Sequence, residues 1–290
     1  MGAQIITRFA PAPTGFLHLG HVVNAIYVWG IARGAGGCVL LRIEDHDRKR
    51  SRPEYERAII EDLDWLGFAA DEGPVHQSER GAIYEAALEH LRSRSLVYAC
   101  ECSRSEIAAA SQPGQELRYP GTCRDKGLPE RPGLGVRARL APSIERFHDL
   151  RHGPQEQRPF EETGDVLLRD RDGHWTYQFA VTVDDQAQQV TLAIRGDDLL
   201  ASTGRQIQLA RLLGRVTPPG FLHHQLLMKS ATQKLSKGDR DTSVRDLRDA
   251  GWTADAIIGR AAARVGLTAS EYPLRAEDVA GLFPRAEGQA

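Results

Sequence analysis

Residues 5–21 constrain the fold of this chain more than any other stretch. A short β-prone run, residues 5–8, is followed by a turn rich in proline and glycine and then by His18-Leu19-Gly20-His21. The apolar residues that come next are spaced for one face of a helix, at Val22, Val23, Ile26 and Trp29. The sequence therefore predicts a strand, a turn and a helix N-terminus. Backbone N–H groups and the positive end of the helix dipole gather at such a turn and favour a bound phosphate.

The histidine pair strengthens the prediction of a nucleotide site. His18 and His21 add two imidazole groups, and Gly20 lets a base or ribose approach the backbone closely. Considered alone, however, the pattern fits a pair of capping or solvated histidines equally well.

A second polar stretch lies far along the chain, around Lys234 and Lys237. Two lysines on a loop can reach a polyphosphate and neutralise the charge that develops as it is cleaved. In this order, the two stretches resemble the HIGH and KMSKS signatures of class I aminoacyl-tRNA synthetases, and residues 8–15 resemble the opening of the glutamyl branch. The resemblance implies that His18, His21, Lys234 and Lys237 are catalytic. It also implies that His18, Gly20, His21 and Lys237 bind ATP, which is accompanied by Mg²⁺.

Composition is that of a globular chain with a sizeable core. Of its 290 residues, 41% are hydrophobic and 26% are charged, and the formal net charge is −2. A nucleic-acid contact must therefore depend on local basic patches. No apolar run reaches the length of a membrane span and the N-terminus lacks a signal-peptide layout. We expect a cytoplasmic monomer without a membrane partner.

Candidate glutamate-binding residues are distributed over the chain. Residues 38–43 are predicted to form a buried parallel strand, and Glu44 follows at its carboxyl end, where doubly wound sheets bind ligands. An ordinary surface carboxylate is the alternative. Arg195 follows another predicted strand and is suited to gripping a carboxylate through two hydrogen bonds, or else to pairing with Asp197 or Asp198. The family resemblance implies that the following residues bind L-glutamate: Arg8, Phe9, Ala10, Pro11, Ala12, Glu44, Tyr177 and Arg195.

Three cysteines, Cys100, Cys102 and Cys123, are grouped within one region. Thiolates from a C-x-C pair and a returning loop suit a structural tetrahedral zinc site, whereas three reduced, buried cysteines are the alternative. His148 and His152 lie downstream as possible fourth ligands. The resemblance to short relatives of the glutamyl synthetases instead implies Tyr119.

The predicted fold is α/β, a Rossmann-like class I catalytic domain with a zinc-bearing antiparallel insertion and a short helical C-terminal region. Residues 166–170 and 175–183 are predicted to be two strands of a hairpin, so Tyr177 is expected on a strand. We expect a first Rossmann half at 1–98, the insertion at 99–185, and a second half with the lysine loop at 186–238. The remaining residues, 239–290, are too few for a helical anticodon-binding domain.

The short C-terminal region and the tyrosine-containing cysteine group together resemble the family of glutamyl-Q tRNA(Asp) synthetases. This family activates glutamate with ATP without tRNA and transfers it to queuosine in the anticodon arm of tRNA(Asp). Alternatives are a truncated glutamyl-tRNA synthetase that charges a 3′ end, a non-catalytic RNA-binding paralogue, and an adenylating biosynthetic enzyme that needs no tRNA. Three positions depart from the glutamyl pattern: Ala12, Val181 and Gly238.

Overall fold

The computed structural model describes residues 4–109, 117–227 and 242–284, and the chain separates into two compact units. Unit 1 comprises residues 1–78, 190–199 and 219–290, and unit 2 comprises residues 79–189 and 200–218.

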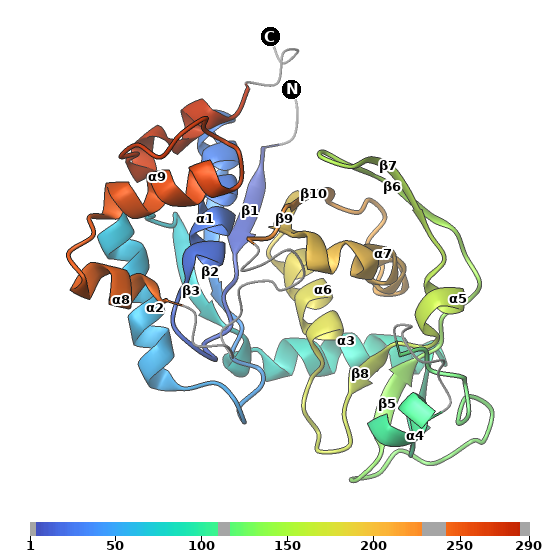
Figure 1. The fold of residues 1–290 in the computed structure, drawn as a ribbon. Coiled ribbons are helices and arrows are strands. Elements are labelled where there is room, and N and C mark those ends of the chain that lie inside the picture. The colour runs from blue at the N-terminus through green and yellow to red at the C-terminus, as the bar shows by residue number, and fades with distance from the viewer. Residues whose placement is uncertain (1–3, 110–116, 228–241, 285–290) are drawn as a thin grey trace. The chain divides into compact units, whose positions relative to one another are not determined.

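Unit 1 is an alternation of parallel strands and helices (Figure 1). Its strands are β1 (Ile6–Phe9), β2 (Cys38–Ile43), β3 (Glu72–His76), β9 (Leu192–Gly196) and β10 (Gly220–His224). Its helices are α1 (Leu19–Gly34), α2 (Pro53–Leu66), α8 (Val244–Asp249) and α9 (Ala254–Arg264), with a 3-10 segment at Ala276–Leu282. Parallel pairing joins β1 to β2, β2 to β3, and β9 to β10. The predicted parallel strand at residues 38–43 and the Rossmann-like character of the domain are therefore confirmed.

Helix α1 occupies the centre of unit 1. It is apolar almost all round, packs against β1 and β2, and is covered on its far side by α9 and the 3-10 segment (Figure 1). A helix with this composition is stable only when it is buried. Gly30 lies at one of these contacts, since a Cβ there would approach the Phe283 ring to 2.3 Å.

Unit 2 combines an antiparallel sheet with a group of helices. Its strands are β4 (Val97–Cys100), β5 (Gly135–Ala138), β6 (Glu145–Asp149), β7 (Gly153–Gln157) and β8 (Leu167–Arg169). Its helices are α3 (Gly81–Ser93), α4 (Arg104–Ala109), α5 (Pro159–Thr163), α6 (Tyr177–Ala187) and α7 (Thr203–Leu212), and 3-10 turns at Gln77–Glu79 and Asp197–Ser202 precede α3 and α7. One sheet has the order β4-β5-β8, and β6 pairs with β7 in an antiparallel hairpin.

One prediction for this unit is wrong. Residues 177–183 belong to helix α6 and not to a strand. Of the expected hairpin, residues 167–169 form β8, and an isolated β-bridge joins Arg169 to Trp175. The β-branched Val181, Thr182 and Val183 favour strands. Packing between α3 and α7 overrides that preference, and Thr182 Oγ1 donates to the carbonyl of Gln178 at 2.7 Å, one helical turn earlier.

Helix α6 is held in unit 2 by a buried carboxylate. Asp184 is fully buried, and it accepts hydrogen bonds from Arg80 Nε at 2.6 Å and from Tyr84 Oη at 2.8 Å. A buried carboxylate that is paired and hydrogen-bonded in this way avoids the large cost of an isolated charge.

Candidate active site

The two histidines of the N-terminal turn cap helix α1. The backbone N–H of Gly20 donates to His18 Nδ1 at 3.0 Å, and the backbone N–H of His18 donates to His21 Nδ1 at 3.1 Å. This reciprocal pair satisfies two of the N–H groups that a helix start leaves without intrahelical partners. Because both Nδ1 atoms accept hydrogen bonds, the N–H of each neutral ring is at Nε2.

Gly20 has a role that the sequence did not reveal. A Cβ at this position would lie 2.9 Å from Cε1 of His18 and 3.0 Å from its Nδ1. A side chain at position 20 would therefore displace the His18 ring from its capping position, so glycine suits the histidine cap as well as any approach of a nucleotide. The His18 and His21 rings lie with their centroids 4.0 Å apart.

The chain returns to this turn at residues 243 and 244, beyond the lysine segment. Lys234 and Lys237 lie outside the described residues. Ser243 forms an isolated antiparallel β-bridge with His18, and the backbone N–H of Val244 donates to the carbonyl of Leu17 at 2.7 Å. Ser243 also caps α8, with its hydroxyl accepting from the N–H of Asp246 at 3.1 Å. Residues 243 and 244, beyond the lysine segment, are thus bound to the histidine turn.

Two candidate glutamate ligands lie at the carboxyl ends of β1 and β2. Arg8 is buried, and its Nη1 donates to the carbonyl of Ile194 at 3.1 Å. Glu44 is 8% exposed; its Oε1 lies 3.3 Å from Arg42 Nη2, and its backbone N–H donates to the carbonyl of Pro11 at 3.0 Å. The structure therefore brings Glu44 and residue 11 of the turn together.

The other candidate glutamate-binding residues of this stretch differ in how far their side chains are exposed. Phe9 is buried, with its ring 5.3 Å from that of Trp29, so its side chain belongs to the core. Ala10 and Ala12 are partly exposed, and the carbonyl of Ala12 accepts from the N–H of Thr14 at 2.8 Å. Ala10 and Ala12 carry no polar side-chain atoms, so any polar contact from these residues to a ligand must come from the backbone.

Arg195 is held inside unit 1 by the adjacent strand. Its Nε donates to Nε2 of the buried His223 at 3.0 Å, and its guanidinium carbon lies 5.7 Å from the centre of the Phe221 ring. Both partners are on β10, which pairs with β9 in parallel. Arg195 is only 4% exposed, and these contacts fix the orientation of its guanidinium.

Tyr177 is the one glutamate candidate in unit 2. It is the first residue of α6 and is partly buried, and it lines a cavity of about 1050 Å³. The same cavity is bordered by Arg137 and by two of the cysteines, Cys100 and Cys102.

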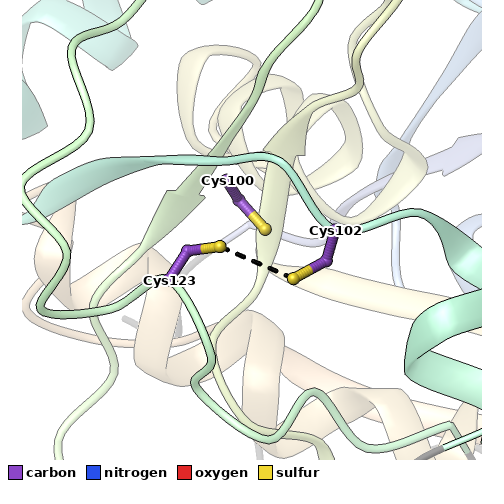
Figure 2. Close-up of side chains that lie close together, drawn as sticks. All are labelled: Cys100, Cys102 and Cys123. Carbon is purple, nitrogen blue, oxygen red and sulfur yellow. Dashed lines mark hydrogen bonds between the residues drawn. The ribbon is translucent and has the colours of Figure 1, made fainter.

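The three cysteines form one cluster in unit 2, with their thiols directed toward one another (Figure 2). The sulfurs of Cys102 and Cys123 are 3.5 Å apart, Cys100 Sγ lies 3.4 Å from Tyr119 Oη, and Tyr119 Oη accepts from the N–H of Cys123 at 2.8 Å. A tetrahedral zinc with Zn–S near 2.3 Å and Zn–O near 2.0 Å has S···S edges of about 3.8 Å and S···O edges of about 3.5 Å. The donor set and its spacing therefore fit zinc.

Tyr119 is the fourth side chain at hand. Among the described residues, no histidine lies within the group of possible metal ligands that the cysteines form. His148 is on strand β6, and His152 lies between β6 and β7.

The thiols of the cluster differ in their pKa. Burial raises the pKa of Cys100, but hydrogen bonds with Tyr119 and Arg137 outweigh it and hold that pKa below its usual value. Burial and the neighbouring Cys123 and Cys100 raise the pKa of Cys102 to about 11.

Arg137 is a residue of this cluster that the sequence analysis missed. It lies on β5, directly opposite Tyr98 of β4, and its Nε donates to Cys100 Sγ at 3.3 Å. The available signal was weak: an arginine within an otherwise apolar strand, close in sequence to the cysteines.

None of the helices within residues 4–109, 117–227 and 242–284 has the length and apolar character needed to cross a bilayer.

Comparison with known proteins gives a consistent match. Residues 4–278 match the family model described as tRNA synthetases class I (E and Q), catalytic domain. A glutamyl-Q tRNA(Asp) synthetase of Rhodobacter capsulatus is 42% identical, with 85% of this chain and 96% of the relative covered. One of Nitratidesulfovibrio vulgaris is 40% identical, with 96% and 92% covered.

Solved structures of glutamate-tRNA synthetases are also similar. The enzyme of Elizabethkingia anophelis matches with a TM-score of 0.80 and 26% identity over 98% of this chain. A glutamate tRNA ligase of Elizabethkingia meningosepticum, in complex with its amino acid, matches with a TM-score of 0.80 and 27% identity. This chain spans 66% and 65% of those two chains.

Proposed function

The chain belongs to the class I tRNA synthetases of the E and Q type, among the glutamyl-Q tRNA(Asp) synthetases, and from that membership we propose a two-step reaction for it. It is an aminoacyl-tRNA synthetase-like ligase. In the proposed reaction it activates glutamate with ATP, without needing tRNA, and transfers the glutamyl group to queuosine in the anticodon of tRNA(Asp).

The observation that carries the proposal is the return of the chain to the histidine turn beyond the lysine segment. Ser243 and Val244 are bound to His18 and Leu17 of that turn. This supports a role for both signatures at one ATP site, because cleavage between the α- and β-phosphates needs donors and cations around the same phosphates. A non-catalytic RNA-binding paralogue would have no need of this arrangement.

In the first step, a glutamate carboxylate oxygen attacks the α-phosphorus, and pyrophosphate leaves with the electron pair of the broken P–O bond. The Nε2–H groups of His18 and His21 are the donors that these rings offer to phosphate oxygens, because both Nδ1 atoms accept backbone hydrogen bonds. Lys234 and Lys237 neutralise the charge that accumulates on the leaving pyrophosphate. Mg²⁺ bound to ATP supplies further neutralisation of the phosphates.

We assign glutamate recognition mainly to residues of unit 1. Glu44 pairs with the α-amino group, and Arg195 and Arg8 are the cations for the carboxylates. Tyr177 stays a further candidate, which the family resemblance implies. The buried, hydrogen-bonded positions of Arg8 and Arg195 support this assignment, because a fixed guanidinium discriminates a carboxylate from an amide better than a mobile one does. Residues 9–12 contribute backbone groups and shape.

In the second step, a hydroxyl of queuosine attacks the carbonyl carbon of glutamyl-adenylate, an ester bond forms, and AMP leaves. Support for this acceptor is the name of the relatives, which are glutamyl-Q tRNA(Asp) synthetases. An unstacked anticodon base is a suitable acceptor, since it can enter a pocket and be recognised on its edges. We further propose that one structural zinc is held by Cys100, Cys102, Tyr119 and Cys123.

The experiment has two arms. Glutamate-dependent exchange of pyrophosphate into ATP is measured without RNA, and labelled glutamate is then offered to anticodon stem-loops of tRNA(Asp) with and without queuosine. We expect exchange without RNA and labelling of the queuosine stem-loop alone, abolished by prior periodate oxidation of the cyclopentene diol. Labelling that requires a 3′-terminal adenosine would indicate a truncated glutamyl-tRNA synthetase, and absence of exchange would indicate a binding protein. Exchange without transfer to any RNA would indicate a biosynthetic adenylating enzyme.

A further inference from the structure

Arg137 is a buried cation in contact with two of the candidate zinc ligands. It is 6% exposed, its Nε donates to Cys100 Sγ at 3.3 Å, and its guanidinium carbon lies 3.7 Å from the centre of the Tyr119 ring. Its Nη1 donates to the carbonyl of Asp165 at 2.8 Å. The Arg137 side chain therefore contacts a sulfur and an aromatic ring, and its hydrogen bond to the backbone fixes the plane of the guanidinium.

The charge of the cluster explains why a cation belongs there. Three thiolates and one Zn²⁺ leave a net negative charge, and Cys100, Tyr119 and Cys123 are all buried. A buried net charge is costly unless it is paired and hydrogen-bonded. Among the contacts of Cys100 and Tyr119 within the described residues, Arg137 supplies the formal positive charge.

The geometry also bears on Tyr119. A guanidinium at 3.7 Å from the ring centre lies within the range of a cation–π contact. The contact holds the ring from one side while the N–H of Cys123 donates to the phenol oxygen at 2.8 Å. Together they keep the oxygen beside the sulfurs.

We propose that Arg137 is a positioning residue of the zinc site, which sets its affinity by donating to the Cys100 sulfur and by holding the Tyr119 ring. The inference rests on the zinc site proposed above and goes beyond it, because Arg137 is not itself a ligand. Partners that orient metal ligands in this way contribute about 10- to 100-fold to metal affinity.

The chain offers a matched control. Arg139 is two residues along the chain, and its guanidinium carbon lies 4.8 Å from the centre of the Tyr98 ring. It donates to Asp125 Oδ1 at 3.2 Å and to the carbonyl of Arg124, so its contacts reach no cysteine sulfur. Arg139→Met therefore removes a similar stacked guanidinium, and the support it gives to the residues that follow Cys123, without removing a contact to the side chain of any proposed ligand.

The test compares zinc affinity by chelator competition for the full chain and for the variants Arg137→Met, Arg137→Lys and Arg139→Met. We expect about 10- to 100-fold weaker binding for Arg137→Met, a smaller loss for Arg137→Lys, and unchanged affinity for Arg139→Met. Should Arg137→Met fail to fold, Arg137→Lys decides the question. Affinities of both Arg137 variants equal to that of the Arg139 control would overturn the proposal.

A spectroscopic measurement separates positioning from mere support of the fold. With Co²⁺ in place of zinc, loss of the hydrogen bond to Cys100 makes its sulfur a better electron donor and moves the thiolate-to-cobalt band to lower energy. We expect this displacement in Arg137→Met and not in Arg139→Met, and an unmoved band in both would contradict the assignment. An unaltered chain that binds no zinc would remove the zinc site itself, whereas pyrophosphate exchange on the same preparations tests the proposed function separately.

Discussion

Replacing Asp62 by asparagine is expected to stabilise the protein at neutral pH. Asp62 lies on α2 and is fully buried, and neither of its carboxylate oxygens has a hydrogen-bond partner within the described part of the chain. The Nε of Arg245 on α8 lies 3.8 Å from Oδ1, too far for a hydrogen bond. Burial raises the pKa of Asp62 from 3.8 to about 6, although Arg245 and Arg248 act in the opposite direction.

The sign and the magnitude follow from that pKa. The folded protein binds a proton at Asp62 more tightly than the unfolded chain does, so its free energy of unfolding falls as the pH rises from about 4 to about 6. One pKa unit corresponds to about 1.36 kcal/mol, so the ionised carboxylate costs about 3 kcal/mol above pH 6. Asparagine is neutral throughout, and Asp62→Asn should therefore gain about 1 to 3 kcal/mol at about pH 7.5 and little at about pH 4.

The assay is urea unfolding of both proteins, followed by tryptophan fluorescence at several values between about pH 4.5 and pH 7.5. Asp64→Asn is the control, because Asp64 is an exposed carboxylate on the same helix. The stability difference should grow with pH for Asp62→Asn and stay near zero for the control. A difference that does not change with pH, or a loss of stability at pH 7.5, would refute the argument.

Three further predictions concern the candidate sites. Lys237→Ala should slow adenylate formation about 100-fold while changing the KM for glutamate little, as read from pyrophosphate exchange, because its charge matters most as pyrophosphate leaves; equal losses in both would argue against this role. Cys102→Ser should abolish binding of about one zinc per chain and loosen the surrounding loops, as measured by elemental analysis and hydrogen exchange. Protein purified without chelator that contains no zinc would contradict the site. Arg195→Gln should reduce the preference for glutamate over glutamine by about 100-fold in kcat/KM, since the charged partner is gone, and an unchanged preference would assign the carboxylate to Arg8 or another residue.

The elements that could be predicted are those in which local pattern and tertiary packing agree. Residues 38–43 form a continuous apolar run, which is typical of a strand buried on both faces, and they are β2. Ser243 and Thr253 begin helices as their cap preferences indicate. The cysteine spacing also located a cluster correctly, because a C-x-C pair keeps two thiols close whatever the surrounding fold.

Other features depend on contacts that a linear pattern does not contain. Residues 177–183 include several residue types that favour strands but form α6. Asp184 of this helix is bound by Arg80 and Tyr84, which are far from it in the sequence. Arg137 reaches Cys100 only through the pairing of β5 with β4. The histidine caps cannot be assigned from the sequence, since histidine is not a preferred cap residue. The roles of Lys234 and Lys237 stay predictions.

The capping arrangement of His18, Gly20 and His21 limits how this stretch of the chain can evolve. A substitution at position 18 or 21 by a residue without a side-chain acceptor leaves the Gly20 or the His18 N–H without this partner, and any Cβ at position 20 meets the His18 ring. Such a mutation therefore carries a folding defect along with any loss of ATP handling. Only replacements that keep an acceptor at positions 18 and 21, such as serine or asparagine and glutamate or glutamine, would separate the two effects.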